Sequence, residues 1–564
     1  MISVSKRNWQ EVKINENIVK KTQQVNDFSN IISRLVVARK FDDEEIYSIK
    51  NYTELSNKFR NNLDFINSSK LVEEAINKKE KVCILGDYDV DGSAATALFI
   101  KFFEKLKHPY FYYIPDRVKD GYGASKKLFQ KLIKKKIKLI IMVDCGSTSN
   151  EAIDFLNKNK IKSLIIDHHE INKPYPKSNE IINPKKNNGY IEYDYLCTTT
   201  LTYFFLEILA LKVNCKINLR KHLIYVLLAT VCDVMPLRKL NRLISIIALK
   251  EFNIKDNYFI KKIYELSNKK NKLNINDLGF LIGPILNAGG RLSKSNYATE
   301  LLSTTNHKII DIKSTELIRL NSKRKKIESN ILNTIDFNVI ENDNKDVIIL
   351  YDQNINEGLI GIIASRLKEY FNKPSIVITN SNNLLKSSAR SVPSYNIGKA
   401  IKRALDKNII LSGGGHNMAA GFTLKKNSLD FFKAFINEDF LKNSNNIKTG
   451  FTYDSEISFS GINKDFFDDI NKLQPFGTGN RLPIFLLKEL KVIKKKILDS
   501  KHISCLLKSK TGKSISSICF NSLNTKVGTH LLNYKKDFNV VGQINENFWD
   551  SKKTLQLIII DLIL

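Results

Sequence analysis

Several patterns are scarce in this 564-residue chain, and each scarcity excludes a class of protein. The 7 cysteines are scattered and none forms a C-x-x-C pair, which excludes a zinc ribbon, an iron–sulfur cluster and a disulfide framework. The N-terminus has no apolar core, so no signal peptide is expected. The two most apolar stretches, 201–211 and 555–564, are interrupted by acids and are too short to span a bilayer. We therefore expect a cytoplasmic protein without a membrane anchor.

Acidic residues are also scarce, since 58 Asp and Glu stand against 89 Lys and Arg, a formal net charge of +31. Such an excess favours a polyanionic partner such as a nucleic acid. The alternative is the codon bias of an AT-rich genome, because Lys, Asn and Ile are used heavily while Gly and Pro number only 24 and 11. The charge therefore permits nucleic-acid binding but does not establish it.

The chain is too long for one hydrophobic core, which predicts several domains. From about residue 68, short apolar runs alternate with helical patterns. Strands are expected at 81–85, 138–143 and 163–166, and helices at 93–106, 124–136 and 149–159. This alternation predicts an α/β fold with a parallel, doubly wound sheet. In such a sheet, binding groups gather at the carboxyl ends of the strands.

Three further regions follow. Residues 219–305 look mostly helical, and apolar residues over 312–337 predict a long linker helix, whose charged run at 323–326 is equally compatible with a solvated surface. A second, smaller α/β unit is expected from a strand at 346–351, a helix at 361–370 and a strand at 374–379. Short alternating runs after about 445 predict a small C-terminal β-barrel of the OB type.

The predicted domains follow from these changes of pattern. They are an N-terminal extension, mostly helical, over 1–66, the doubly wound domain over 67–310, a linker helix over 311–342, the smaller α/β domain over 343–440 and the barrel over 441–564.

Acids and histidines stand at the ends of apolar runs in the first α/β region. The set comprises Asp87, Asp89, Asp91, Asp144, Asp167, His168, His169, Asn183 and Asp233. Carboxylates are hard ligands for Mg²⁺ or Mn²⁺, and an added imidazole favours Mn²⁺. Two such ions ~3.5–4 Å apart can share a carboxylate and hold a phosphoryl group between them. The set therefore predicts a site for two divalent cations.

The first motif alone, Asp-x-Asp-x-Asp-Gly over 87–92, has a second interpretation, because calcium loops use the same spacing. A calcium loop needs a Glu shortly afterwards within a helix–loop–helix. Here the corresponding positions hold Leu98 and Phe99, and a strand is expected before the motif. The two-cation interpretation is favoured.

At 167–169 the sequence resembles the DHH phosphoesterase superfamily, and the order of its motifs is similar to the branch of single-strand-specific 5′→3′ DNA exonucleases. The resemblance extends over roughly residues 70–564. The matching motifs lie at 86–92, 120–123, 143–146, 167–169, 183–184, 233–237, 287–292, 357–362, 389–391, 413–416, 418–421 and 475–480.

The resemblance implies a two-metal phosphodiesterase acting on single-stranded DNA in recombination and repair, with Mn²⁺ or Mg²⁺ as cofactor. The implied metal ligands are Asp89, Asp91, Asp144, His168 and Asp233. Asp144 would bridge the two ions, and Asp87 and Asp167 would orient ligands or water. His169 would stabilise the charge of the departing oxygen.

The second α/β unit resembles the DHHA1 domain, which implies a clamp for the DNA strand and its 5′-terminal phosphate. The implied contacts are Arg117, Tyr122, Arg291, Ser388, Arg390, Gly414, Gly415 and His416. Arginine suits this role because its guanidinium pairs bidentately with phosphate. Two alternatives stay open: the glycine-rich stretch at 413–416 is a plain turn, or Tyr122 packs instead of stacking on a base.

The sequence departs from the family pattern at two places. Thr198 and its neighbours over 197–200 stand where relatives often carry a glycine-rich turn, which leaves the role of that helix start open. Ala389 stands where glycine is common.

Two other functions are weighed against the exonuclease. A DHH enzyme acting on oligoribonucleotides or cyclic dinucleotides would be much shorter and would lack the terminal barrel. A strand-binding scaffold without catalysis would not need the complete set of acids and histidines. The resemblance further implies a monomer, with single-strand-binding protein and a helicase as partners.

Overall fold

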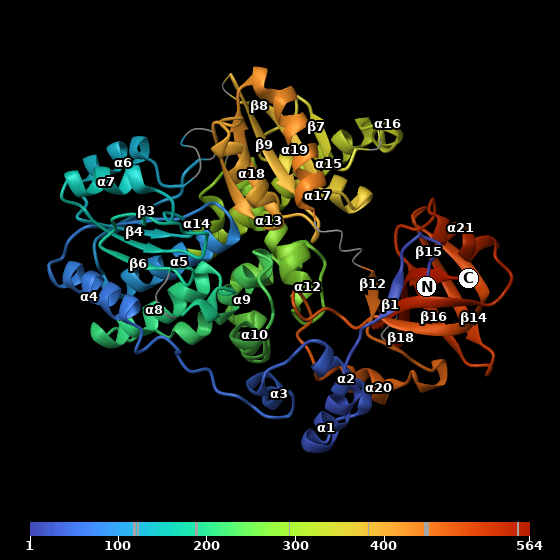
Figure 1. The fold of residues 1–564 in the computed structure, drawn as a ribbon. Helices are drawn as coiled ribbons and strands as arrows, with labels where there is room; N and C mark the ends of the chain where they lie inside the picture. The colour runs from blue at the N-terminus through green and yellow to red at the C-terminus, as the bar shows by residue number, and fades with distance from the viewer. Residues whose placement is uncertain are drawn as a thin grey trace. The chain divides into compact units, whose positions relative to one another are not determined.

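The computed structural model describes residues 1–116, 120, 123–186, 190–292, 294–343, 345–381, 383–444, 450–549 and 552–564. The chain forms two compact units (Figure 1). Unit 1 comprises 1–55, 236–247 and 448–564, and unit 2 comprises 56–235 and 248–447. Across the described ranges, no helix combines the length and the apolar character that crossing a bilayer requires.

A parallel sheet with strand order β3-β2-β4-β5-β6 lies at the centre of the first half of unit 2. Its central strands are short apolar runs buried on both faces, as expected when helices cover the two sides. The strands are β2 (Val82–Leu85), β3 (Tyr110–Tyr113), β4 (Leu139–Val143), β5 (Lys162–Ile166) and β6 (Glu180–Ile182).

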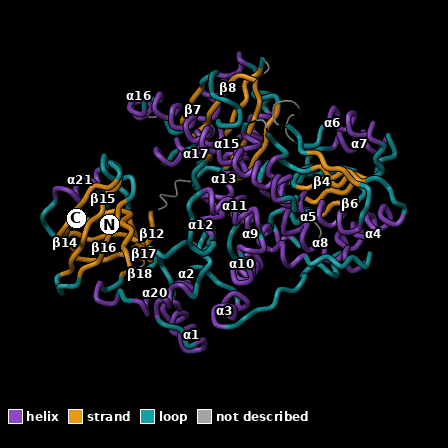
Figure 2. The backbone as a smooth tube through the Cα atoms, turned by 180° about the vertical axis from the view of Figure 1, so that it is seen from behind, coloured by secondary structure: helices purple, strands orange, loops and turns teal. Residues whose placement is uncertain are grey.

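Helices cover both faces of this sheet, which confirms the predicted doubly wound fold (Figures 1 and 2). Apolar side chains of α6 and α7 pack on one face, and α4, α5 and α8 contact the strands from the other. These helices are α4 (Leu63–Asn77), α5 (Val90–Leu106), α6 (Lys126–Leu132), α7 (Asn150–Lys158) and α8 (Thr198–Lys212).

Helix α5 begins three residues earlier than the sequence indicated, at Val90 rather than Ser93. Asp89 is its N-cap, and its Oδ1 accepts a hydrogen bond from the Gly92 N–H at 3.0 Å. A Cβ on Gly92 would lie 2.6 Å from the backbone nitrogen of Asp87, so only glycine fits this tight turn. The acidic motif is therefore part of the helix start.

The remainder of the first half of unit 2 is helical, as predicted. Helix α9 (Leu223–Cys232) is buried from Leu223 to Thr230. A continuous helical segment is formed by α12 (Ile275–Asp277), the π-helical turn η5 (Leu278–Ile282) and α13 (Gly283–Arg291). The other helices of this region are α11 (Tyr258–Leu266) and α14 (Tyr297–Ser303), while α10 (Lys239–Glu251) belongs to unit 1 up to Ile247.

The long helix α15 spans His307–Thr334, with α16 (Phe337–Asn342) after it. Its charged run is not simply a solvated surface, because Arg324 is buried and its guanidinium pairs with Glu328 at 2.8 Å. Glu328 also accepts a hydrogen bond from Arg366 of α17 (Ile360–Phe371) at 2.8 Å. The charges thus join the helix to the second sheet domain.

The second sheet of unit 2 has strand order β10-β11-β9-β8-β7, with β7 and β8 parallel and the others antiparallel. The stretch at 413–416 lies within the exposed edge strand β10 rather than in a plain turn, because it pairs along its length with β11. The elements are β7 (Ile348–Tyr351), β8 (Ser375–Ser381), β9 (Leu384–Arg390), β10 (Ser412–His416), β11 (Ala419–Leu424), α17, α18 (Ile397–Asp406) and α19 (Leu429–Asn443).

Unit 1 contains the predicted OB-like barrel. The strands follow the order β13-β14-β15-β16-β18-β17, and pairing of β14 with β17 closes the barrel. Several are longer than the short strands expected, since β14 has 14 residues. The elements are β13 (Ser455–Glu456), β14 (Phe485–Leu498), β15 (His502–Ser509), β16 (Ser514–Cys519), α21 (Lys526–Asn533), β17 (Phe538–Trp549) and β18 (Lys552–Ile563).

The N-terminal residues belong to the same unit as the barrel. Strand β1 (Trp9–Glu11) pairs in parallel with β12 (Phe451–Tyr453), and the buried Trp9 indole donates to the buried Asp561 carboxylate at 3.0 Å. Unit 1 therefore does not follow the predicted limits of an extension over 1–66. Its helices are α1 (Glu16–Asn26), α2 (Asn30–Ala38), α3 (Asp43–Lys50) and α20 (Lys464–Asn471).

The motif at 475–480 has a structural role in unit 1. The Asn480 amide, fully buried, donates to the carbonyls of Leu473 and Pro475, both at 2.8 Å. The Thr478 carbonyl accepts from the N–H of Leu237 at 2.7 Å. This turn fixes the segment 236–247 within unit 1.

Candidate metal centre

The predicted acidic and histidine residues converge at the carboxyl edge of the central sheet. Strand order places β2 between β3 and β4, so the connection direction reverses beside β2, where ligands bind in doubly wound sheets. The residues after β2, β4 and β5 therefore meet there, and Asp233 joins them as the C-cap of α9. Ligand atoms lie within 4.8 Å of one another in three overlapping groups: Asp87, Asp89 and Asp144; Asp144, His168 and His169; Asp91, His168 and Asp233.

Asp144 occupies the centre of this cluster. Its Oδ1 lies 3.6 Å from His168 Nε2 and 3.8 Å from His169 Nδ1. The side chain is 1% exposed, and its backbone has φ of 62°, a left-handed conformation that is costly for a non-glycine residue. Such strain is concentrated at functional sites, where surrounding contacts hold it in place.

His168 faces three carboxylates with one ring nitrogen. Its Nε2 lies 3.3 Å from Asp233, 3.6 Å from Asp144 and 3.8 Å from Asp91. Burial, with a smaller effect of the His169 charge, lowers the pKa of His168 to about 3. The ring is therefore neutral and forms no ion pair with these acids. Its Nδ1 is buried without a hydrogen-bond partner among the residues that the structure describes.

The carboxylates of the cluster repel one another, and the charge of His169 offsets this repulsion only in part. Burial and then the charges of Asp91 and Asp89 raise the pKa of Asp144 and of Asp233 well above the ordinary range. Burial and Asp91 likewise raise the pKa of Asp89. Carboxylate oxygens are the ligands that Mg²⁺ and Mn²⁺ prefer, and Mn²⁺ also accepts a neutral imidazole. The cluster therefore fits two divalent cations, because Asp144 and His168 each belong to two of the three ligand groups.

His169 differs from His168 because it is held by one acid. Its Nδ1 lies 2.7 Å from Asp167 Oδ1, and the side chain is 33% exposed. Burial alone would lower the pKa of His169, but the charge and hydrogen bond of Asp167 raise it to about 9. Burial opposes ionisation of Asp167, yet the charge and hydrogen bond of His169 lower its pKa overall. The result is an oriented imidazolium beside the cluster.

Backbone and amide groups fix the orientation of this pair. Asp167 also accepts from the backbone N–H groups of His168 at 2.8 Å and Ser147 at 3.1 Å. The buried Asn183 amide donates to the Ser147 hydroxyl and to the His169 carbonyl, both at 2.9 Å. This contact explains why the Asn-Pro motif accompanies the histidines.

The sequence did not assign Thr198 and Thr199, although it marked their segment as unusual. The backbone N–H groups of these residues, at the start of α8, donate to the two carboxylate oxygens of Asp91 at 2.8 and 2.7 Å. The Thr198 hydroxyl donates to Asp144 at 3.0 Å. A run of small polar residues before an apolar helix was the available signal, because it marks a helix start that can bind an anion.

The second sheet domain brings one predicted residue close to the cluster. The His416 ring lies 5.9 Å from the His169 ring, nearly parallel at 24°. Its Nδ1 is 3.6 Å from Glu170 Oε1. Gly414 and Gly415 precede it in the exposed strand β10.

Ser388 and Arg390 lie on the same face of β9, where buried residues alternate with partly exposed ones. The Arg390 guanidinium donates to the Ser388 hydroxyl at 3.2 Å. A Cβ on Gly361, in the first turn of α17, would lie 3.1 Å from Ser388 Oγ and 3.2 Å from Arg390 Nη2. Guanidinium, hydroxyl and helix N-terminus together are suited to an anion.

Arg291 ends α13, and its Nη1 donates to the Gly358 carbonyl at 3.2 Å, which brings it to the same domain. Arg117 and Tyr122 lie outside the described residues.

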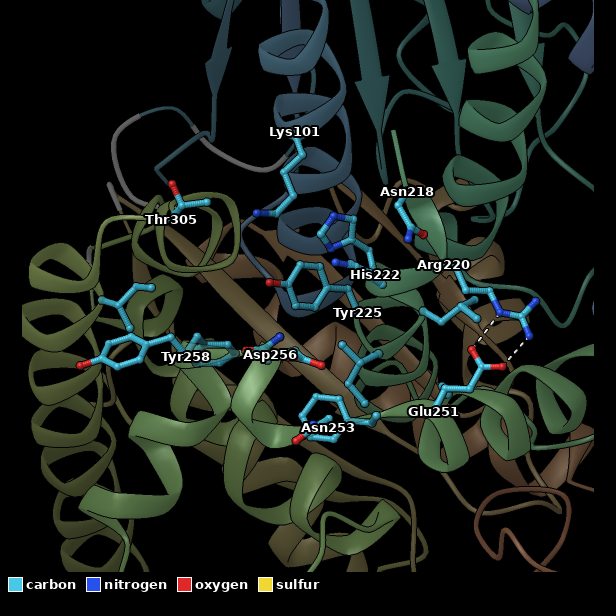
Figure 3. Close-up of a pocket in the computed structure, with 18 of the residues that line it drawn as sticks. Lys101, Asn218, Arg220, His222, Tyr225, Glu251, Asn253, Asp256, Tyr258 and Thr305 are labelled. Atoms are coloured by element: carbon cyan, nitrogen blue, oxygen red, sulfur yellow. Dashed lines mark hydrogen bonds and ion pairs between the residues drawn. The ribbon is translucent and has the colours of Figure 1, made fainter. Parts of the chain in front are cut away.

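A separate cavity of about 440 Å³ lies beside α5 and α9, away from the ends of these helices that carry Asp91 and Asp233 (Figure 3). Lys101, His222 and Tyr225 lie together in its wall, and the Arg220–Glu251 ion pair, at 2.6 Å, stands at one side. No described member of the predicted site lines this cavity. The chemistry therefore belongs to the open carboxyl edge of the sheet.

Family models and relatives agree with this architecture. The chain matches the DHH family N-terminal domain over 81–231, the DHHA1 domain over 344–442 and the RecJ OB domain over 453–561. It is 26% identical to the single-stranded-DNA-specific exonuclease RecJ of Bacillus subtilis, covering 99% of this chain and 71% of the relative. Identity to RecJ of Haemophilus influenzae is 27%, covering 87% and 88%.

Solved structures show the same fold. RecJ from Thermus thermophilus in complex with Mn²⁺ has a TM-score of 0.81 at 20% identity, covering 98% of this chain and 79% of that one. The Mg²⁺ complex has a TM-score of 0.75 at 19% identity, covering 99% and 78%. With its DHH, DHHA1 and RecJ OB domains in this order, the chain belongs to the RecJ branch of the DHH/DHHA1 phosphoesterase superfamily.

Proposed function

We propose that the protein is a metal-dependent exonuclease that hydrolyses single-stranded DNA from its 5′ end. The observation that carries this proposal is the cluster of buried carboxylates around the neutral His168 at the carboxyl edge of the sheet. The relatives named as single-stranded-DNA-specific exonucleases support the substrate.

Five side chains would hold the two Mn²⁺ or Mg²⁺ ions: Asp89, Asp91, Asp144, His168 and Asp233. When bound, the ions supply positive charge for a phosphodiester and activate water for attack on it. Asp144 is the proposed bridge, because among the carboxylates of these groups it is the one that belongs to two of them. Asp87 belongs to one of these groups and is proposed to orient its neighbours.

His169 is proposed to stabilise the departing oxygen. Its Nδ1 is occupied by Asp167, so the other ring nitrogen is left to donate a proton or hydrogen bond. Burial favours the neutral ring, but the charge and hydrogen bond of Asp167 favour the protonated ring that this role requires. Asp167 acts through His169, because Asp167 itself is fully buried.

The DHHA1 domain is proposed to select the 5′ end. Arg390 and Ser388, beside the first turn of α17, would bind a terminal phosphate dianion. The strand backbone would contact Arg291, His416 and the N–H groups of Gly414 and Gly415, together with Arg117 and Tyr122. Capture of the terminal phosphate at a fixed position would impose 5′→3′ polarity.

The alternative functions find less support. The match to the RecJ OB domain over 453–561 argues against an enzyme of cyclic dinucleotides, which needs no such barrel. A scaffold without catalysis would not need carboxylates buried at raised pKa. We also propose a cytoplasmic monomer that works in recombination and repair with single-strand-binding protein and a helicase.

One assay tests the central proposal. A single strand labelled at either end is incubated with Mn²⁺, with Mg²⁺ or with EDTA, and matched duplex DNA serves as the control. We expect mononucleotides from the 5′ end with either metal, none with EDTA and little from the duplex. Release from the 3′ end first, or no cleavage with any metal, would contradict the proposal.

A further inference from the structure

Phe280 is an exposed aromatic residue in a segment that is otherwise packed. It lies in the π-helical turn η5, where Leu278 and Ile282 are fully buried, yet its own side chain is 80% exposed. π-Helical turns inside helices are frequently found at functional sites. The exposed phenyl ring offers apolar surface that a bound partner could cover.

The turn packs on the end of α9 that supplies a predicted metal ligand. A Cβ on Gly279 would lie 3.2 Å from Val231, and one on Gly283 would lie 2.4 Å from the sulfur of Cys232. Asp233 follows Cys232 directly and approaches His168 at 3.3 Å. The glycines that flank Phe280 thus face α9 beside the metal cluster.

The same helical segment passes the cluster and ends at the second sheet domain. A Cβ on Gly290 would lie 2.6 Å from the Tyr88 ring, next to Asp89, and Arg291 donates to Gly358. Phe280 and Arg291 are 11 positions apart, which is about 16 Å along a helix at 1.5 Å per residue. Arg291 therefore lies at the end of this helical segment that reaches the proposed 5′-end contacts, and Phe280 lies towards its other end.

A second apolar side chain is exposed near Asp233. Val234, the next residue, is 65% exposed and has φ of 59°, a costly conformation for a β-branched residue. The end of α9 thus presents apolar surface beside a cluster of charged ligands. Bases of a single strand have apolar faces and charged phosphates, which is the complementary combination.

We propose that Phe280 stacks on a base of the DNA strand at least two nucleotides to the 3′ side of the bond being cut, and so retains the strand between cleavage events. This inference rests on the proposed exonuclease function and adds a base subsite to it. Stacking on an aromatic side chain tolerates any base, because each base has a π face. The subsite would therefore strengthen binding without sequence preference.

The test compares Phe280→Ala with Phe280→Trp. Binding of a 5′-phosphorylated single strand is measured by fluorescence anisotropy in EDTA, so that cleavage does not interfere. We expect Phe280→Ala to weaken binding roughly 5- to 100-fold and Phe280→Trp to bind like the wild type. Phe431→Ala is the matched control, because Phe431 is 77% exposed on α19 and should leave binding unchanged.

Two further readouts separate stacking from a structural effect. A single abasic position moved along the strand should weaken wild-type binding at one location, and Phe280→Ala should abolish that dependence. A 5′-phosphorylated dinucleotide does not reach the subsite, so Phe280→Ala should cleave it at the wild-type rate with Mn²⁺. Wild-type binding by Phe280→Ala, or an equal loss on the dinucleotide, overturns the inference. Absence of cleavage by the wild type would instead refute the proposed function, while the binding comparison in EDTA still tests stacking.

Discussion

The candidate metal cluster and the proposed phosphate contacts of the second sheet domain lie in opposite physical environments. Asp91, Asp144 and Asp167 are almost completely buried, and backbone N–H groups or hydroxyls hold their carboxylates. Strand β10 and the His416 side chain, in contrast, are exposed. Cation coordination requires fixed donors in a dry environment, whereas a strand that advances after each cut requires accessible contacts. Substitutions in the cluster should therefore abolish turnover, and substitutions in the clamp should alter substrate preference.

The largest effect is expected from Asp144→Ala. Loss of the proposed shared ligand should reduce turnover roughly a thousandfold or more, because several kcal/mol of charge stabilisation disappear. Strand binding measured in EDTA should remain. Asp311→Ala, at a partly exposed position of α15, is the control and should retain activity. Near-normal turnover of Asp144→Ala would show that the bridging role is wrong.

Thr198→Val should lower turnover roughly 10- to 100-fold, the usual effect of removing a group that orients a metal ligand. Valine keeps the shape and the backbone N–H to Asp91 but lacks the hydroxyl that donates to Asp144. Thr198→Ser should restore activity. Thr202→Val is a matched control on the same helix, because the buried Thr202 hydroxyl has no partner within the described part of the chain. Equal effects of Val at 198 and 202 would argue against a positioning role.

Arg390→Ala should act on the substrate rather than on chemistry. We expect KM for a 5′-phosphorylated strand to rise roughly 10- to 100-fold, because charge-assisted hydrogen bonds to the phosphate are lost. A 5′-hydroxyl strand should be affected much less. Arg319→Ala, on the exposed face of α15, is the control. Equal losses on the two strands would reject the end-binding role.

The last expected effect is on stability rather than on activity: bound metal should stabilise the fold against heat. At a Mn²⁺ concentration a hundred times Kd, each bound ion should stabilise the fold by about 2.7 kcal/mol, which differential scanning calorimetry detects as a higher Tm. Asp144→Ala should show a much smaller increase. An identical increase in both proteins would place the ions elsewhere.

The sequence predicted the parts of the fold in which local pattern and tertiary contacts agree. The buried apolar strands β2, β4 and β5 were found because their runs are short, continuous and followed by acids. Strand β3 was missed although aromatic residues favour strands, because its four residues are only half-buried and do not form a buried aliphatic run. Strand β10 was missed as a strand, because its glycines indicate a turn and only pairing with β11 makes it extended.

The site was predicted as a set of residue types, while its supporting contacts were not. Thr198 could not be assigned, since its contact with Asp144 joins residues 54 positions apart. The different states of His168 and His169 were also invisible, because they depend on burial and on a single bond to Asp167. Contacts of this kind arise from the three-dimensional arrangement and have no local sequence pattern.

Carboxylates and imidazoles that are far apart in the sequence are proposed to hold a pair of cations together. Anomalous scattering from crystals grown with Mn²⁺ tests this proposal most directly. We expect two peaks at the carboxyl edge of the sheet, both adjacent to Asp144, with His168 and Asp233 at one of them. A single peak away from these residues, or none at saturating Mn²⁺, would contradict it.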